Sequence, residues 1–182
     1  MVDPQSYETT KQNYCGSIGT AVDYLTRFHL TGNLKESFAI SISGATRAGK
    51  LELAEKLLEE VNGLDKKSII ATVKLASFDV FVRNPIRAMM SRLNQTTNVS
   101  DEAIYNIQIM VKRCLQLFDE YGPITGCHLL FTGAYTKNIS SGDADYITAD
   151  TIWDIKTSKK DIGIQDTYQI LLYYLLSQHS DL

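Results

Sequence analysis

The stretch GDADYITADTIWDIKTSKK, residues 142–160, decides how this sequence is interpreted. Its first half places Asp145 in a short extended segment, residues 148–150 can turn the chain, and the second half places Asp154 and Lys156 in the next extended segment. Residues i and i+2 of a strand share a face, so the side chains of Asp154 and Lys156 are expected to point the same way. The sequence therefore predicts two neighbouring strands that bring two carboxylates beside one ammonium group.

Two carboxylates and a lysine are a minimal set of side chains for metal-dependent hydrolysis of a phosphodiester. The carboxylates of Asp145 and Asp154 are hard ligands suited to Mg²⁺ or Mn²⁺, and Mg²⁺ is usually held by one or two carboxylates together with water and phosphate oxygens. A bound metal polarises the phosphoryl group and lowers the pKa of its water. The ammonium group of Lys156 can orient that water or offset negative charge in the transition state. We therefore expect these three residues to be catalytic.

A helix predicted over residues 165–178 adds two polar side chains. Gln169 and Tyr173 are spaced i and i+4, so they lie on one helical face. The rest of this helix is apolar almost all round, which predicts that it is buried. An amide and a phenol that face the strand segment are expected to steady Lys156 or to contact substrate.

Taken in order, these motifs resemble the PD-(D/E)XK nuclease superfamily and, within it, the RecB-like exonuclease branch. The motifs are Gly142-x-x-Asp145, Asp154-x-Lys156-Thr157 and Gln169-x-x-x-Tyr173. The resemblance is strongest over residues 140–176. It implies a restriction-endonuclease-like core, in which a mixed β-sheet is flanked by helices, and metal-dependent cleavage of DNA.

The resemblance also implies residue roles. Asp145, Asp154 and the backbone carbonyl of Ile155 would be metal ligands, Lys156 would be the catalytic lysine, and the Gln/Tyr pair would support them. Upstream, the sequence GTAVD, which ends at Asp23, is similar to the G-T-x-x-H helix of that branch. Asp23 stands where histidine is usual and is expected to be a supporting residue. Relatives usually continue with another strand, so we expect a protein partner or a further C-terminal segment.

Hydrophobic periodicity predicts a mixed α/β chain of one domain. Its helical N-terminal part covers about residues 1–122, and the catalytic sheet and Gln/Tyr helix cover about residues 123–182. Helices are predicted over about residues 14–30, 51–62, 66–78 and 101–121, a strand over residues 38–43, and short strands within residues 127–157.

Composition narrows the class of protein. A protein that coats nucleic acid through its overall electrostatic field is usually basic, so the net charge of −3 excludes that class. A DNA partner would therefore have to be bound by a local basic patch. Lys159 and Lys160 are the weak candidates for such contacts, because they directly follow the strand segment. Three cysteines exclude a four-thiolate metal site and a disulfide framework. The longest apolar run, residues 170–176, is too short to span a bilayer, so a cytoplasmic protein is expected.

Two alternatives remain at this point. A catalytically inactive nuclease fold could serve as a DNA-binding or protein-interaction module, and Asp23 in place of histidine favours it. Gly44 to Lys50 resembles a phosphate-binding loop, although Leu51 stands where a metal-coordinating hydroxyl is required. The sequence leaves open whether cleavage starts at an end or internally, and whether the substrate is single-stranded DNA, double-stranded DNA or RNA.

Overall fold

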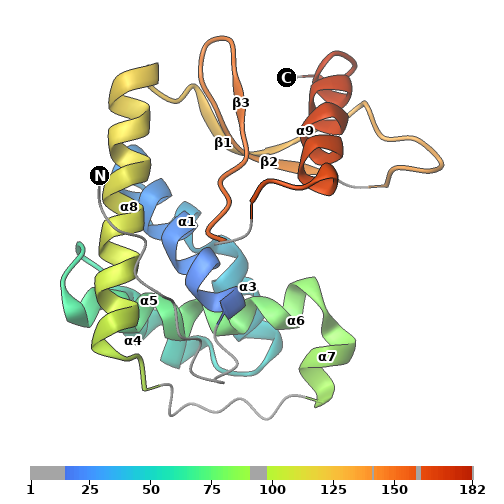
Figure 1. The fold of residues 1–182 in the computed structure, drawn as a ribbon. Helices are drawn as coiled ribbons and strands as arrows, with labels where there is room; N and C mark the ends of the chain where they lie inside the picture. Colours follow the sequence, from blue (N-terminus) through green and yellow to red (C-terminus); the bar gives the residue numbers. More distant parts are fainter. Residues whose placement is uncertain (1–14, 91–97, 141, 159–160, 182) are drawn as a thin grey trace.

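The computed structural model describes residues 15–90, 98–140, 142–158 and 161–181, whose arrangement is shown in Figure 1. The N-terminal part is helical, and the C-terminal part combines a small sheet with one helix, so the chain mixes α and β structure as predicted. The elements in chain order are α1 (Cys15–Thr31), α2 (Leu34–Ser37), α3 (Ala39–Arg47), α4 (Leu51–Glu59), α5 (Lys66–Ala76), the 3₁₀ turn η1 (Ser77–Asp79), α6 (Val80–Arg83), α7 (Pro85–Met90), α8 (Asp101–Tyr121), β1 (Gly126–Leu130), β2 (Asp143–Ile147), β3 (Ile152–Trp153) and α9 (Ile164–Ser177).

Three helices form the core of the helical part. Helix α1 packs against α5 and α8, and their apolar side chains meet in a cluster that includes the fully buried Leu25, Ile69 and Ile107. Helix α8 begins after Ser100, whose hydroxyl accepts a hydrogen bond from the Ala103 N–H at 3.2 Å. The first and the longest of the predicted helices are therefore confirmed.

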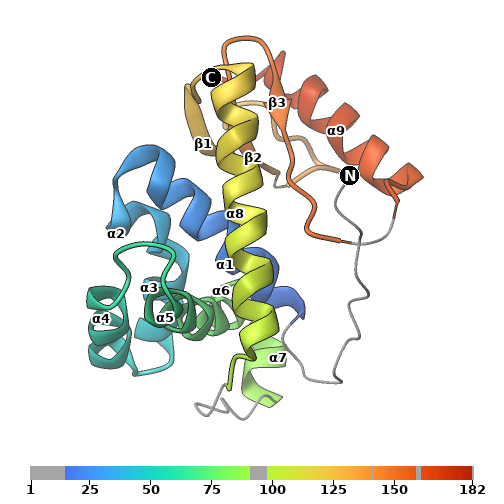
Figure 2. The same ribbon diagram turned by 60° about the vertical axis from the view of Figure 1, so that its left-hand side comes forward.

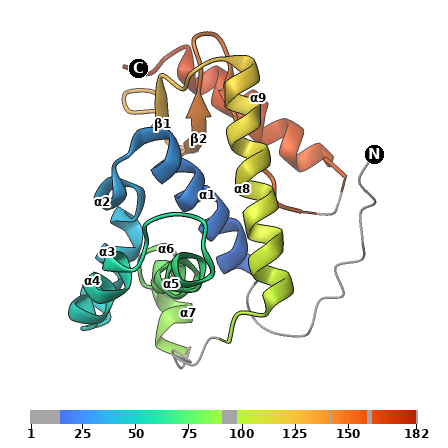
Figure 3. The ribbon, with the colours of Figure 1, turned by 90° about the vertical axis from the view of Figure 1, so that its left-hand side faces the viewer.

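Helix α8 links the helical part to the sheet. It runs from a start beside α5 to an end beside the strands (Figures 1 and 3). Near that end the ring centroid of Phe118 lies 4.9 Å from that of Tyr146 in β2 and 6.0 Å from that of Trp153 in β3. These aromatic contacts hold the sheet against the helices.

The strand predicted over residues 38–43 is wrong, because residues 39–47 form helix α3. Ser41, Gly44 and Ala45 are buried at helical spacing, and the Ser41 hydroxyl donates a hydrogen bond to buried Asp79 at 2.7 Å. A short run of alternating apolar and small residues fits both the two-residue period of a strand and the 3.6-residue period of a helix. Packing against η1 favours the helix here.

Helix α3 also replaces the phosphate-binding loop considered above. Gly44 lies inside the helix, and a Cβ at this position would be 2.1 Å from the backbone carbonyl oxygen of Phe78. Gly44 therefore permits close packing of α3 on the segment around Phe78. This packing explains the glycine without a bound nucleotide.

The sheet is a three-stranded meander. Strand β1 pairs with β2 and β2 pairs with β3, both antiparallel, in the order β1-β2-β3. Only residues 148–151 separate β2 from β3, which is too short a connection for a parallel crossover. Over the described residues, the mixed sheet implied by the resemblance is therefore wrong.

Helix α9 lies beside the sheet at the edge of the molecule (Figures 1 and 2). Tyr173 and Leu176 are buried and pack in a second apolar cluster with Phe131 and Ala144. Most of the other apolar side chains of α9 are exposed, so the prediction of a helix buried almost all round is wrong. The small sheet covers one side of the helix only. None of the described helices combines the length and apolar character that a bilayer crossing requires.

Candidate functional site

Asp145 lies at the centre of the candidate site. The register of β1 and β2 leaves His128 opposite Asp145. The register of β2 and β3, continued one residue beyond β3, leaves Asp154 opposite Asp145 on the other side. The two carboxylates predicted to converge therefore come from adjacent segments of the meander, with a histidine on the third.

The segment that carries Asp154 and Lys156 is extended but lies outside β3, which ends at Trp153. The prediction that both residues sit within a strand is wrong in this respect. The Ile155 N–H donates a hydrogen bond of 2.7 Å to the Asp145 side chain. A side-chain carboxylate, not a backbone carbonyl, accepts this N–H, so the β2–β3 backbone pairing does not continue to Ile155. The same hydrogen bond ties the segment that carries Asp154 and Lys156 to β2.

A chain of polar contacts connects this segment to α9. The Lys156 ammonium lies 2.6 Å from a carboxylate oxygen of Asp154 and donates a hydrogen bond of 2.8 Å to the Gln169 side-chain oxygen. The Gln169 amide in turn donates to the Tyr173 hydroxyl at 2.6 Å. Asp166, in the first turn of α9, lies 3.9 Å from the same ammonium. The sequence prediction that Gln169 steadies Lys156 agrees with this geometry.

The electrostatics of the site are dominated by carboxylates. Burial, reinforced by the negative charges of Asp23 and Asp154, raises the pKa of Asp145 to about 6, against the opposing effects of the Ile155 N–H and Lys156. The Asp154 side chain is only 8% exposed. Partial burial lowers the pKa of Lys156, but the hydrogen bond to Asp154 and the nearby carboxylates outweigh it and leave that pKa raised. Lys156 is therefore a cation at neutral pH, held among acidic groups.

Tyr173 joins the site to the second apolar cluster. Its ring centroid is 5.4 Å from that of Phe131. Burial and the charges of Asp143, Asp154 and Asp145 raise the pKa of its hydroxyl, while the hydrogen bond from Gln169 opposes the change. Its phenol therefore stays protonated beside the carboxylates and can act as a hydrogen-bond donor.

Asp23 has partners of its own on α1 and β2. It forms an ion pair with buried Arg27 one turn later, and the Tyr146 hydroxyl donates a hydrogen bond of 2.9 Å to its other carboxylate oxygen. Its charge still contributes to the raised pKa of Asp145. The structure thus places Asp23 at the junction of α1 and the sheet, within electrostatic reach of the candidate centre.

The glycine of the GTAVD sequence sets how closely α1 approaches the site. A Cβ at Gly19 would lie 2.8 Å from the hydroxyl oxygen of Thr157. The segment that holds Asp154 and Lys156 therefore packs directly on α1. This close approach gives a physical reason for a glycine one turn before Asp23.

Sequence reasoning missed His128. Its φ of 51° is left-handed, and no other non-glycine residue in the described part of the chain has a positive φ. Its Nδ1 lies 3.6 Å from a carboxylate oxygen of Asp143, and burial, followed by the charge of Arg27, lowers its pKa. Only the register of β1 and β2 places His128 opposite Asp145. The lengths of the predicted strands do not determine that register.

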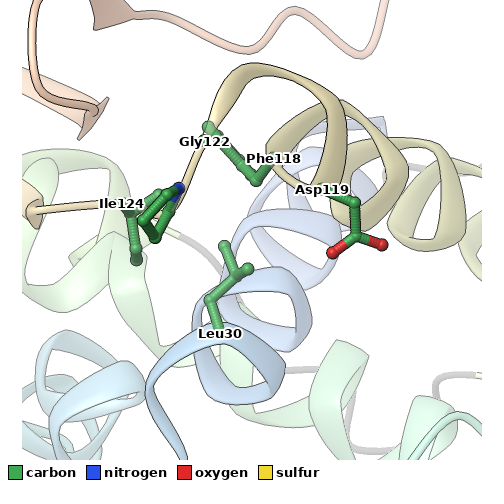
Figure 4. Close-up of a pocket in the computed structure, with 6 residues that line it drawn as sticks. Leu30, Phe118, Asp119, Gly122 and Ile124 are labelled. Atoms are coloured by element: carbon green, nitrogen blue, oxygen red, sulfur yellow. The ribbon is translucent and has the colours of Figure 1, made fainter.

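Two candidate residues are not described by the structure, and one hollow lies apart from the candidate site. Lys159 and Lys160 fall outside the described residues. A hollow of about 360 Å³ is formed by the ends of α1 and α8 and the residues that follow α8, and Figure 4 shows Leu30 reaching from α1 toward the end of α8. Among the described residues, Asp119 is the only ionisable one that lines it, and none of the described candidate site residues borders it.

The donor set fits a hard divalent cation. Within the described ranges, no group of three or more His, Cys, Asp or Glu side chains is placed to hold a metal. A site of two carboxylates is nevertheless sufficient for Mg²⁺, which takes its remaining ligands from water and phosphate. Burial, with the charges of Asp23 and Asp154 added to it, raises the pKa of Asp145, and a bound cation would favour the ionised carboxylate.

Comparisons with known proteins add no neighbour: no family model, curated protein or solved structure matches the chain.

Proposed function

We propose that this protein is a Mg²⁺- or Mn²⁺-dependent nuclease that hydrolyses phosphodiester bonds in DNA, with exonuclease activity expected from the RecB-like resemblance. One observation carries the proposal. Of the residues selected by sequence motif, Asp154, Lys156, Gln169 and Tyr173 form a continuous chain of side-chain contacts between two separate segments. Asp145, from a third segment, is tied to this chain through the backbone N–H of Ile155, which lies between Asp154 and Lys156. If the hairpin were only a solvated polar turn, nothing would require its lysine to contact both a carboxylate and a glutamine on a distant helix.

In this proposal each side chain has a task that its contacts support. Asp145 and Asp154 would hold the metal, which supplies a polarised phosphoryl group and a more acidic water when bound. Lys156 is kept charged and is aimed by Asp154 and Gln169, so it would orient the attacking water or offset charge on the phosphoryl oxygens. Tyr173 holds the Gln169 amide in the orientation that presents its oxygen to Lys156.

Cleavage of end-labelled linear DNA tests this proposal. Wild type is incubated with single-stranded or double-stranded DNA and Mg²⁺ or Mn²⁺, beside an EDTA control, Asp154→Asn and Asp150→Asn. Asp150 is the matched control, because it is an exposed carboxylate nearby in the sequence, in the β2–β3 connection and outside the proposed site. We expect metal-dependent cleavage by wild type and Asp150→Asn only. Full activity of Asp154→Asn, or no cleavage by a folded wild type that binds Mn²⁺, would count against the proposal.

The second candidate is a nuclease-like fold that binds DNA or protein without cutting. The observation that favours it is the engagement of Asp23 by Arg27 and Tyr146, which leaves this carboxylate less available to a metal. This candidate predicts DNA or protein binding that EDTA does not change and that Asp154→Asn retains.

A further inference from the structure

The outer side of α9 carries an apolar stripe that is exposed among the described residues. We define the outer stripe as four residues of α9, which are Ile164, Tyr168, Leu171 and Leu175. They are 68%, 62%, 50% and 50% exposed, respectively. Their spacing of four, three and four residues places them on one side of the helix, as at the contact positions of paired helices. We propose that the outer stripe is the contact surface of a homodimer, in which α9 packs against α9 of a second copy.

The opposite side of α9 is already occupied. Tyr173 and Leu176 are buried in the second apolar cluster, and Gln169 is bound to Lys156. Figures 1 and 2 show α9 at the periphery, with the sheet on one side. The outer stripe is therefore not a misplaced core face, because the helix has a separate inner face that the sheet uses.

The charges of α9 favour a second copy over a charged partner. Asp166 is the only charged residue of the helix, and it accepts a hydrogen bond from the Gly163 N–H at 2.9 Å and lies 3.9 Å from Lys156, on the inner side. Two outer stripes can therefore meet without like-charge repulsion. An acidic or basic peptide would find no opposite charge on the outer stripe itself.

The same composition argues against a lipid surface as the occupant. Helices that lie on membranes usually carry Lys and Arg on their polar side. Helix α9 has no Lys or Arg, and its inner side is turned to the sheet. An uncharged apolar stripe of this kind is better matched by an identical stripe.

The exposed area is also of the size that a dimer needs. Tyr174, which borders the outer stripe, is 56% exposed, and Ile162, just before the helix, is 80% exposed. If the roughly 200 Å² of a large aromatic side chain is taken for all six residues, the outer stripe and these two neighbours expose about 700 Å² on each copy. Specific interfaces bury about 800 Å² on each partner, while the largest apolar patch on a monomer is about 300–600 Å².

Sedimentation velocity of the full chain tests the dimer. Wild type is measured from about 1 to 100 µM beside Leu171→Glu, Tyr168→Lys and the control Gln165→Glu. The control adds the same negative charge as Leu171→Glu, at an exposed position of α9 outside the stripe. We expect a dimer for wild type and Gln165→Glu. Both stripe variants should be monomeric with unchanged circular dichroism, because the replaced side chains are at least half exposed and their loss leaves the core intact.

Three results would overturn the dimer. The first is a wild type that stays monomeric at 100 µM, the second is a dimer that survives both stripe variants, and the third is a monomer that sediments with vesicles of neutral phospholipid. The last result would assign the outer stripe to a membrane surface instead. None of these outcomes depends on the proposed nuclease activity, so the two proposals succeed or fail separately.

Discussion

Replacing Asp145 by asparagine should stabilise the protein at neutral pH while it removes the proposed function. The Ile155 N–H needs an acceptor, and the side-chain oxygen of asparagine supplies one. What the variant loses is a charge that burial and the neighbouring Asp23 and Asp154 disfavour. The folded-state pKa of about 6, set against an ordinary value of about 3.9, corresponds to at most about 3 kcal/mol.

The pH dependence fixes the sign of this effect. Above pH 6 the carboxyl group of Asp145 is ionised in both the folded and the unfolded chain. The folded state then carries the full free-energy cost of the buried negative charge. Between pH 6 and pH 4 the folded state binds a proton before the unfolded state does, and the cost declines. The asparagine variant should therefore unfold with a free energy up to about 3 kcal/mol higher than wild type at pH 7, and with nearly the same free energy near pH 4.

Urea unfolding in EDTA, followed by fluorescence of the single tryptophan, Trp153, measures this difference. Trp153 stacks near Phe118 and Tyr121, so its emission reports the junction of the sheet and α8. Asp150→Asn, which replaces an exposed carboxylate in the β2–β3 connection, should show little change at either pH. An Asp145→Asn variant less stable than wild type at pH 7, or a difference equal at pH 4 and pH 7, would refute the reasoning.

Three other substitutions follow from single contacts. Gly44→Ala should lower the free energy of unfolding by about 3 kcal/mol, since its Cβ would meet a backbone oxygen at 2.1 Å, whereas Gly63→Ala, with nothing within 4 Å, should be near neutral; urea titrations compare the two. Gln169→Leu should lower the cleavage rate by about 10- to 100-fold with an unchanged circular dichroism spectrum, because Lys156 loses an acceptor. His128→Gly should be more stable than His128→Ala by about 1 kcal/mol in thermal melts, because both remove the imidazole and only glycine adopts a φ of 51° without strain.

The candidate site was largely predictable because it depends on short-range spacing. The turn between Asp145 and Asp154 brings two strand segments together whatever the rest of the chain does. The i, i+4 spacing of Gln169 and Tyr173 likewise needs only a helix, and the two side chains are hydrogen-bonded in the structure. Lys156 then meets Gln169, as the prediction that this helix steadies the lysine required.

What could not be predicted depends on tertiary packing. The alternation of residues 38–43 fits a strand as well as a helix, and burial of Ser41 against Asp79 decides for the helix. The exposure of α9 depends on the size of the sheet beside it, which its own composition does not reveal. Neither the left-handed backbone of His128 nor its place opposite Asp145 has a sequence signal.

Binding of Mn²⁺, measured by electron paramagnetic resonance, tests the central claim most directly, because the proposed chemistry requires Asp145 and Asp154 to hold a divalent cation. Wild type and Asp150→Asn are compared with Asp145→Asn and Asp154→Asn at pH 7.5, where the Asp145 carboxylate, with a pKa of about 6, is ionised. We predict Mn²⁺ binding by the first two proteins and its loss in the last two, with all four folded. Equal Mn²⁺ binding by all four, or none by wild type, would contradict the account.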